Sequence, residues 1–462
     1  MASVGSEAKL VDIVGSYIAR SGQSELPDVV VSKAKHHILD TLAAIVSGSR
    51  LKPGQVAIDF VQSQVAAQEA QVIGSQTVSS AVNAAFANAM MGHADETDDA
   101  HLASRTHPGC AVVPAALAMS ERGESNGMDF LKSVVAGYEI GCRITQAIGI
   151  DNIRKKSFCT FSLGGNFGAA SAAAAAARLD ERQVKYALSY AAHQALAMTY
   201  WTRDEEHVEK AYVFGGMPAR NGVMAVLQIQ SGFTGVGNPF GGEGNFFEPF
   251  APDAQPDLLI RGLGKDFEVM SASIKKYAVG YPIQAPVDGL LRMIGRHGFS
   301  AGNVESITTG IDAWNASIVN DRDMPDINLQ HLLAVTLLDG GLSFEAAHSF
   351  ARMQDTAVLD VRKRVKLIKD SGLPRNHCTI EVKTRDGCIY SERITTVHGR
   401  PDNPMPTEMV EAKCRELMIP ILGEDRTGML IDRIWNLEHL SSIRELRPLL
   451  SASSENTEAS HH

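Results

Sequence analysis

The stretch that decides the fold is residues 165–179, GNFGAASAAAAAARL. Alanine has the highest helix propensity, and neither proline nor strand-type alternation interrupts the run, so these residues predict a helix. Their small side chains let neighbouring helices approach closely. A helix this rich in alanine is therefore expected to pack tightly against other helices.

Helical patterns continue on both sides of this run. Apolar residues recur at three- and four-residue spacing, and the segment that begins at residue 29 stops at Gly48. The helical segments are 29–48, 79–96, 110–123, 130–149, 181–197 and 218–232. Residues 234–250, TGVGNPFGGEGNFFEPF, predict a loop, and their GGEGN lacks the Lys-Ser/Thr of a phosphate-binding loop. Residues 1–268 are therefore expected to form an all-helical domain.

The sequence pattern changes after residue 268. β-Branched residues and alternation predict strands over 305–314, 364–370, 378–384 and 388–396, and the last two form a hairpin that turns at Arg385-Asp386-Gly387. Helical segments lie between them. We expect a smaller α/β domain over 269–398 with an antiparallel sheet, a return to the helical domain over 399–450, and a disordered tail over 451–462. The predicted fold class is mainly α with a smaller α/β domain.

Composition excludes several classes of protein. The chain has 462 residues, which is long enough for two domains, and its net charge of −10 argues against nucleic acid as a partner. No apolar run approaches the roughly 18 residues of a membrane-spanning helix, and the N-terminus lacks the apolar core of a secretory signal. The six cysteines form no C-x-x-C pair, so free thiols in a reducing compartment are expected. These features predict a cytoplasmic protein.

Residues 93–108, HADETDDAHLASRTHP, combine three histidines with four carboxylates. Imidazoles titrate near neutral pH, which is what a proton-transfer site requires. His107 is the candidate general acid or base, and Asp98 and Glu96 are candidates to orient an imidazole or to act as a base. The alternatives are a histidine that caps the following helix and carboxylates that cap helices or form a buried ionic network. A metal site made of these acids is also conceivable, but the D-x-D-x-D-G pattern is missing.

Six stretches together carry a resemblance to a known family. They are residues 93–109, 164–179, 210–235, 273–291, 326–341 and 398–409. In order and spacing they resemble the MmgE/PrpD family, which includes 2-methylcitrate dehydratase, cis-aconitate decarboxylase and iminodisuccinate epimerase. The resemblance covers nearly the whole chain. It implies a large helical domain, a smaller α/β lid domain, a homodimer, an active site in the cleft between the domains, and chemistry without a metal or organic cofactor.

The resemblance also assigns roles to particular residues. The acids and histidine of the first motif match Glu96, Asp98, Asp99 and His107, although Thr97 stands where relatives have an aromatic residue. The family's catalytic lysines are matched by Lys210, with a one-residue offset, and by Lys275, with Lys276 beside it.

This chain departs from the dehydratase and decarboxylase branches at three positions. Cys159 stands near the place of a family histidine, and approximately Gly280 and Gln284 replace two histidines of the lid motif. We expect Cys159 to be a small buried residue rather than a nucleophile, because nothing in the sequence lowers the pKa of its thiol.

Four further residues are candidates for substrate binding. Arg105 could hold a carboxylate through two hydrogen bonds, Lys276 could pair with one, Tyr281 could donate to an oxyanion, and His101 lies within the first motif. Each has an alternative role in packing or in a solvated surface, and His93 is as plausibly structural as catalytic. The pairs His36-His37 and Met90-Met91 are interpreted as surface and core residues, respectively.

The sequence thus predicts a cofactor-independent enzyme that removes a proton next to a carboxylate of a small di- or tricarboxylate. Elimination of water, a hydro-lyase reaction of the 2-methylcitrate dehydratase kind, is the first hypothesis. Epimerisation uses the same proton removal and is the alternative, as is decarboxylation. A non-catalytic ligand-binding relative is the alternative from another class.

Overall fold

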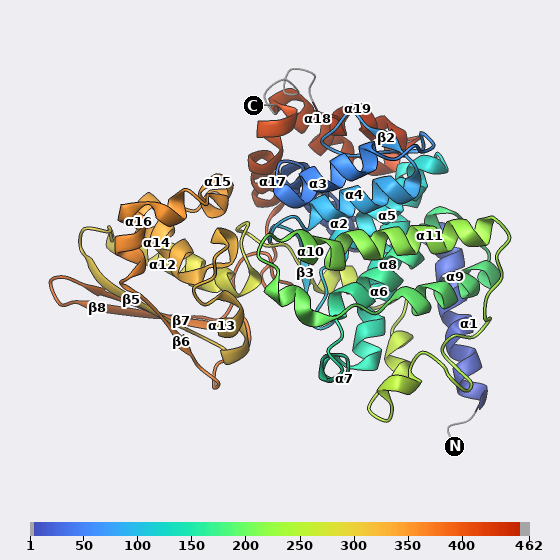
Figure 1. The fold of residues 1–462 in the computed structure, drawn as a ribbon, viewed down its shortest axis with the longest axis horizontal. Helices are drawn as coiled ribbons and strands as arrows, with labels where there is room; N and C mark the ends of the chain where they lie inside the picture. The colour runs from blue at the N-terminus through green and yellow to red at the C-terminus, as the bar shows by residue number, and fades with distance from the viewer. Residues whose placement is uncertain (1–3, 453–462) are drawn as a thin grey trace. The chain divides into compact units, whose positions relative to one another are not determined.

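The structure is a computed structural model, which describes residues 4–452 (Figure 1). The described chain divides into two compact units. The helical unit comprises residues 4–94, 98–273 and 407–452, and the smaller unit comprises residues 95–97 and 274–406. The tripeptide 95–97 therefore belongs to the smaller unit, although the chain on both sides of it belongs to the helical unit.

The helical unit consists of helices and four two-residue strands. Its helices are α1 (Val4–Arg20), α2 (Asp28–Gly48), α3 (Lys52–Gln62), α4 (Ala81–Gly92), α5 (Pro108–Arg122), α6 (Gly127–Ile148), α7 (Ile150–Lys155), α8 (Thr160–Ala176), α9 (Glu181–Gln194), α10 (Val208–Ala211), α11 (Met217–Gln230), α17 (Thr407–Leu422), α18 (Glu424–Trp435) and α19 (Arg447–Leu450). A π-helical turn, Tyr212–Gly216, joins α10 to α11. The strands β1 (Ala70–Gln71) and β2 (Val78–Ser79) pair with each other, as do β3 (Ala100–His101) and β4 (Ala272–Ser273).

Helix α8, the alanine-rich segment, packs against α5, α6 and α11. Glycines allow the closest of these contacts. A Cβ added to Gly141 of α6 would lie 2.6 Å from the carbonyl oxygen of Gly164 in α8, and one added to Gly164 would lie 2.7 Å from that of Gly141. Side chains at these two positions would push the helices apart. The close packing that the alanine run predicts is therefore confirmed.

The smaller unit packs helices against a four-stranded sheet. Its helices are α12 (Gln284–His297), α13 (Ala313–Val319), α14 (Leu329–Asp339), α15 (Phe344–His348) and α16 (Thr356–Arg362). Its strands are β5 (Val304–Ile311), β6 (Val365–Lys369), β7 (Cys378–Thr384) and β8 (Ile389–Ile394), in the order β6-β5-β7-β8. Alternate residues of β7 are buried on one face, where the strands contact α12 and α14 (Figure 1).

Two of the three pairings in this sheet are antiparallel, including the predicted hairpin, in which Cys378 is paired with Ile394 and Lys383 with Ile389. Strands β5 and β6 are parallel, with Ile307 opposite Val365. The segment predicted as a strand over 305–314 ends early, because the Asp312 side chain accepts the backbone N–H of Asn315 and so caps α13.

The mainly α fold with a smaller α/β part is confirmed. No helix within residues 4–452 is long and apolar enough to cross a membrane. All six cysteines are free thiols, and only Cys388 is exposed. The tail expected to be disordered lies outside the described residues from 453 onward, and the carbonyl of Ser451, just before it, accepts a hydrogen bond from Arg426 at 2.7 Å.

Candidate active site

The acid-histidine motif forms a buried bridge in the helical unit. Asp98 is fully buried, and its two carboxylate oxygens lie 2.9 Å from His93 Nδ1 and 3.2 Å from His107 Nδ1. The His93 ring is also buried, whereas the His107 side chain keeps 10% of its surface exposed. One carboxylate therefore lies against two imidazoles, hydrogen-bonded to His93 and within ion-pair distance of His107, and His107 is the one that solvent can reach.

Asp99 fixes the place where His107 stands. Helix α5 begins at Pro108, which has no backbone N–H that would need an acceptor. The next backbone N–H, that of Gly109, donates to Asp99 Oδ1 at 2.9 Å. Asp99 Oδ2 accepts hydrogen bonds from Tyr138 Oη at 2.7 Å and His37 Nδ1 at 2.9 Å. Burial alone would raise the pKa of Asp99, but the hydrogen bonds from His37 and Tyr138 outweigh it, so the pKa lies below its usual range.

His37 was expected on the surface, and that expectation is wrong. Its side chain is fully buried and bonded to Asp99. Burial is also the first cause that lowers the pKa of His37 to about 4. This histidine is therefore a structural support of the Asp99 segment, whereas its neighbour His36 is partly exposed. Met90 and Met91 are buried, as predicted.

His207 and Lys210 bring a third imidazole and an ammonium group to the same cluster. His207 adopts a left-handed conformation, with φ of 63°, immediately before α10, and its ring centroid lies 5.3 Å from that of His93. Asp204 starts this turn by accepting the backbone N–H of Lys210 at 2.8 Å. Lys210 is 7% exposed, and its Nζ lies 5.5 Å from the centre of the Phe214 ring. We call His93, Asp98, His107, His207 and Lys210 the histidine cluster.

Aromatic rings pack against the histidine cluster within the helical unit. Phe214 stacks on His93 with centroids 4.4 Å apart, and Phe161 stacks on Phe214 at 3.9 Å. The apolar surroundings disfavour a charged imidazole, so burial lowers the pKa of His93. Cys159, which packs against Phe214, is buried as expected, and burial raises the pKa of its thiol to about 11. The thiol is therefore poorly suited to act as a nucleophile.

Three donors of the helical unit lie close enough to be considered as metal ligands. Ligand atoms of His93, Asp98 and Cys110 lie within 4.8 Å of one another. Cys110 Sγ, however, donates to the carbonyl of His107 at 3.2 Å, and a thiol has to lose its proton to bind a metal ion. The contacts therefore fit a hydrogen-bonded set of groups better than a metal centre.

The smaller unit holds the other two predicted catalytic residues together. Lys275 is 1% exposed, and its Nζ donates to the carbonyl of Glu96 at 2.8 Å and lies 3.5 Å from the Glu96 carboxylate. Glu96 is 5% exposed. A buried ammonium beside a buried carboxylate is the charge pairing that a low-dielectric interior requires. The motif residues Glu96 and Lys275, far apart in sequence, are therefore neighbours.

A second pair within the smaller unit fixes Asp95, the residue before Glu96. Asp95 accepts the Thr97 N–H at 2.8 Å and the Thr97 hydroxyl at 2.6 Å, and its Oδ2 lies 2.8 Å from His348 Nε2. Thr97, which replaces the aromatic residue of relatives, therefore closes a local turn. Burial alone would lower the pKa of His348, but the hydrogen bond and charge of Asp95 raise it to about 9.

This pair predicts a stability that depends on pH. The pKa of His348 rises from 6.5 to about 9 on folding, so its contribution is complete below pH 6.5 and is lost as pH rises through 9. We expect His348→Gln to lower the free energy of unfolding in urea by on the order of 2 kcal/mol at pH 6 and by almost nothing near pH 10. His297→Gln, which changes an exposed histidine of the same unit, is the control. A deficit equal at both pH values would contradict this interpretation.

The predicted substrate-binding residues are spread over both units. His101 is buried, with Nδ1 2.7 Å from Ser104 Oγ and Nε2 3.1 Å from Glu268. Burial opposes its charge, but Cys142 and Glu268 raise its pKa to about 10. Arg105 has a positive φ of 52° and is partly exposed. Its carbonyl accepts the Thr160 hydroxyl at 2.6 Å.

Lys276 and Tyr281 belong to the smaller unit. Lys276 Nζ lies 3.0 Å from Asp288 Oδ1, so its ammonium group already forms an ion pair with a carboxylate of the protein itself. Tyr281 is partly buried at the start of a short turn, Tyr281–Ile283. The structure therefore brings His107, Asp98 and Lys210 together in one unit and Glu96 with Lys275 in the other, whereas His101 pairs with Glu268 and Lys276 with Asp288.

Gln284, at the approximate position of a family histidine, has a structural role here. Its Oε1 accepts the Tyr277 N–H at 3.1 Å, and its Nε2 donates to the carbonyls of Tyr277 and Val279 at 2.8 and 3.0 Å. All the polar atoms of this amide therefore brace the loop that follows Lys275. Gly280 has no side chain to offer, and its N–H donates to the carbonyl of Asp326 at 3.0 Å.

Sequence reasoning missed His37, His207 and His348. His37 follows Ala34 by three residues and precedes Thr41 by four, which places it on the apolar face of α2 and could have predicted its burial. His207 precedes Lys210 by three residues, one helical turn. No local signal marks His348, because its partner Asp95 is far away in the sequence.

Comparison with known proteins identifies the family. A model of the MmgE/PrpD N-terminal domain matches residues 13–259, and one of the MmgE/PrpD C-terminal domain matches residues 277–438. Together they span most of the chain. The chain belongs to the MmgE/PrpD family. The resemblance carried by the six motifs is therefore confirmed. The C-terminal MmgE/PrpD match includes α17 and α18, which in this structure belong to the helical unit.

Named relatives of this MmgE/PrpD protein align over almost its entire length. Cis-aconitate decarboxylase of Aspergillus terreus is 25% identical over 464 aligned positions, covering 92% of this chain and 93% of the relative. The cis-aconitate decarboxylase of Homo sapiens is 25% identical, covering 93% and 92%, and that of Mus musculus is 26% identical, covering 95% and 92%. These relatives are enzymes, and decarboxylases are lyases.

Proposed function

We propose that this protein is a lyase that acts on a small di- or tricarboxylate, and that the reaction starts with removal of a proton from a carbon next to a carboxylate. The observation that carries the proposal is the bridge of Asp98 to both His93 and His107, with only His107 open to solvent. A carboxylate on one ring nitrogen fixes the tautomer of an imidazole and leaves the other nitrogen for proton transfer.

In this proposal His107 moves the proton and Asp98 is its positioning residue. Asp98 Oδ1 lies 3.2 Å from His107 Nδ1, on one side of the ring, so Nε2 is the atom proposed to exchange a proton with the substrate. His93 shares the same carboxylate, and burial lowers its pKa, which favours a neutral imidazole beside His107. Asp99 supports this arrangement through the Gly109 N–H at the start of α5.

The lysines supply positive charge for the carboxylates and for the enolate-like intermediate. Lys210 presents an ammonium group in an aromatic, largely buried surrounding, where electrostatic stabilisation is stronger than in water. Lys275 and Glu96 are proposed to act in the same reaction, since Glu96 is only two residues before Asp98 in the chain. Glu96 is the second candidate base, held by Lys275.

The first candidate outcome is elimination of water, with His107 or Tyr281 protonating the leaving hydroxyl group. Decarboxylation is the second candidate: loss of carbon dioxide would leave a carbanion-like carbon that His107 protonates, and the names of the relatives, which all describe a cis-aconitate decarboxylase, favour it. Epimerisation is the third candidate. It needs no acid to protonate a leaving group, and this chain lacks two family histidines, near Gly280 and Gln284, that could serve as such acids. Free buried cysteines support a cytoplasmic location, and a homodimer stays an expectation from the family resemblance.

A proton NMR screen of small di- and tricarboxylates in deuterium oxide tests the proposal. We expect turnover of at least one compound, retained after incubation with EDTA, with loss of the α-proton signal. An alkene product identifies dehydration, release of carbon dioxide identifies decarboxylation, and deuterium in recovered substrate without an alkene identifies epimerisation. Compounds that raise the melting temperature without any reaction or exchange would instead support a ligand-binding relative.

A further inference from the structure

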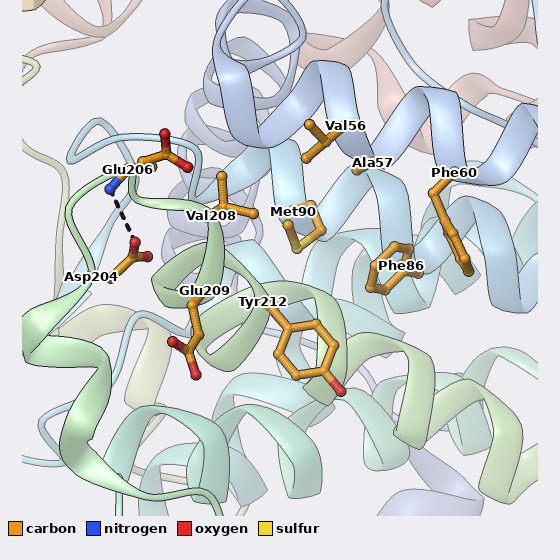
Figure 2. Close-up of a pocket in the computed structure, with 10 residues that line it drawn as sticks. All are labelled: Val56, Ala57, Phe60, Phe86, Met90, Asp204, Glu206, Val208, Glu209 and Tyr212. Carbon is orange, nitrogen blue, oxygen red and sulfur yellow. Dashed lines mark hydrogen bonds between the residues drawn. The ribbon is translucent and has the colours of Figure 1, made fainter.

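A cavity of about 450 Å³ lies in the helical unit between α3, α4 and the segment from Asp204 to Tyr212 (Figure 2). It is lined by Val56, Ala57, Phe60, Phe86, Met90, Asp204, Glu206, Val208, Glu209 and Tyr212. None of these residues belongs to the histidine cluster. A volume of this size is within the range of about 300–1,000 Å³ that small-molecule sites have.

One end of the cavity is aromatic. The rings of Phe60 and Phe86 meet edge to face with centroids 5.6 Å apart, and Phe86 meets Tyr212 in the same way at 6.3 Å. Phe60 is 52% exposed and Val56 is 40% exposed. The guanidinium of Arg220 already lies 5.8 Å from the centre of the Tyr212 ring. The aromatic surface that remains for a ligand is therefore that of Phe60 and Phe86.

The other end of the cavity is acidic. Figure 2 shows the carboxylates of Asp204, Glu206 and Glu209 on the side away from Phe60 and Phe86. Asp204 accepts the backbone N–H groups of Glu206 and Lys210, and Glu206 forms an ion pair with Lys52. Glu209 has no ion-pair partner among the described residues. Asp204 has no ion-pair partner there either, but both of its oxygens accept backbone N–H groups, so Glu209 is the carboxylate of this cavity that is left to pair with a ligand.

We propose that this cavity binds an organic cation, namely an amine on a compact aromatic or aliphatic body. Aromatic faces and carboxylates both attract a cation, and an ammonium at the acidic end would place its apolar body against Phe60, Phe86 and Met90. The acidic end would repel a carboxylate, so the ligand class is the opposite of the substrate class proposed for the histidine cluster. The inference does not depend on that proposed function.

Three ligands that share one phenylpropyl group but carry a positive, a neutral or a negative end group test this inference. We titrate 3-phenylpropylamine, 3-phenylpropanol and 3-phenylpropanoate into the full-length protein by ligand-observed NMR at low salt. The amine is expected to bind about tenfold more tightly than the alcohol, and the acid to bind more weakly than either. Equal affinity for the amine and the alcohol would overturn the proposal.

Two variants then locate the bound amine. Glu209→Gln is expected to reduce the affinity for the amine by about fivefold to tenfold and to leave the affinity for the alcohol unchanged. Phe60→Ala is expected to weaken both ligands, and because Phe60 is half exposed this variant should fold. Glu205→Gln is the matched control, since Glu205 is an exposed carboxylate one residue from the cavity lining.

Equal loss of amine affinity in Glu209→Gln and Glu205→Gln would show only a general effect of negative charge and would overturn the assignment. A Phe60→Ala protein that keeps full affinity for both ligands would place the bound amine elsewhere and overturn it as well. A second copy of the chain could cover the cavity instead. In that case the wild type would bind no amine, and sedimentation would show that Phe60→Ala weakens self-association. That result would also contradict the proposal.

Discussion

His107→Gln is expected to lower kcat by about 10²- to 10⁴-fold on the substrate that the NMR screen identifies, which is the usual range for loss of a positioned acid or base. Glutamine has nearly the volume of histidine but cannot exchange a proton near neutral pH. Because His107 is partly exposed, its replacement should leave the fold intact. Steady-state kinetics and exchange of the α-proton in deuterium oxide measure the effect.

The matched control is His193→Gln, which changes an exposed histidine of the same unit outside the histidine cluster. It should keep wild-type kinetics. A His107→Gln protein that keeps a wild-type rate of α-proton exchange would remove His107 from the proton transfer. If exchange survives while product formation is lost, His107 would be the acid for the leaving group instead of the base.

Lys210→Met is the second change with a large expected effect. Methionine keeps most of the apolar stem against Phe214 and Trp201 and removes only the charge. We expect kcat/KM to fall by about 10²- to 10³-fold, as when one group that stabilises a developing negative charge is lost. Lys210→Arg should recover little of this activity, because a planar guanidinium does not fill the place of an ammonium.

Lys156→Met, at an exposed lysine of the helical unit, is the control for Lys210→Met and should be silent. A rise in KM with unchanged kcat would mean that Lys210 binds the ground state and the transition state equally, and would assign it to substrate binding alone. Unchanged kcat/KM would exclude it from the reaction.

Much of the fold could be predicted because its signals are local. The run 165–179 lies largely within α8, and the hairpin turns at residues 385–387 as expected. The parallel pairing of β5 with β6 could not be predicted, since nothing within either strand specifies which neighbour it joins. The end of β5 was misplaced because a cap formed by Asp312 competes with strand propensity.

The candidate site was predictable only in part. The motif 93–108 placed Asp98 and His107 in one segment, and the family resemblance added Lys210 and Lys275. The motif does not predict the burial of His37 or the pairing of His348 with Asp95. Asp99, the partner of His37, lies more than sixty residues away in the chain, and Asp95 lies more than two hundred and fifty residues from His348. Hydrogen bonds over such separations leave no periodicity in the sequence.

The sequence by itself determined the helices and strands, the family and the kinds of chemical group available, because helix and strand propensities and short motifs act over a few neighbouring residues. The tertiary structure alone decided which imidazole stays open to solvent, which carboxylate bridges two of them, and which ammonium stands beside which acid. Those outcomes depend on burial and on contacts between distant segments, and burial is what turns an ordinary histidine or aspartate into a group with a fixed proton and a fixed orientation.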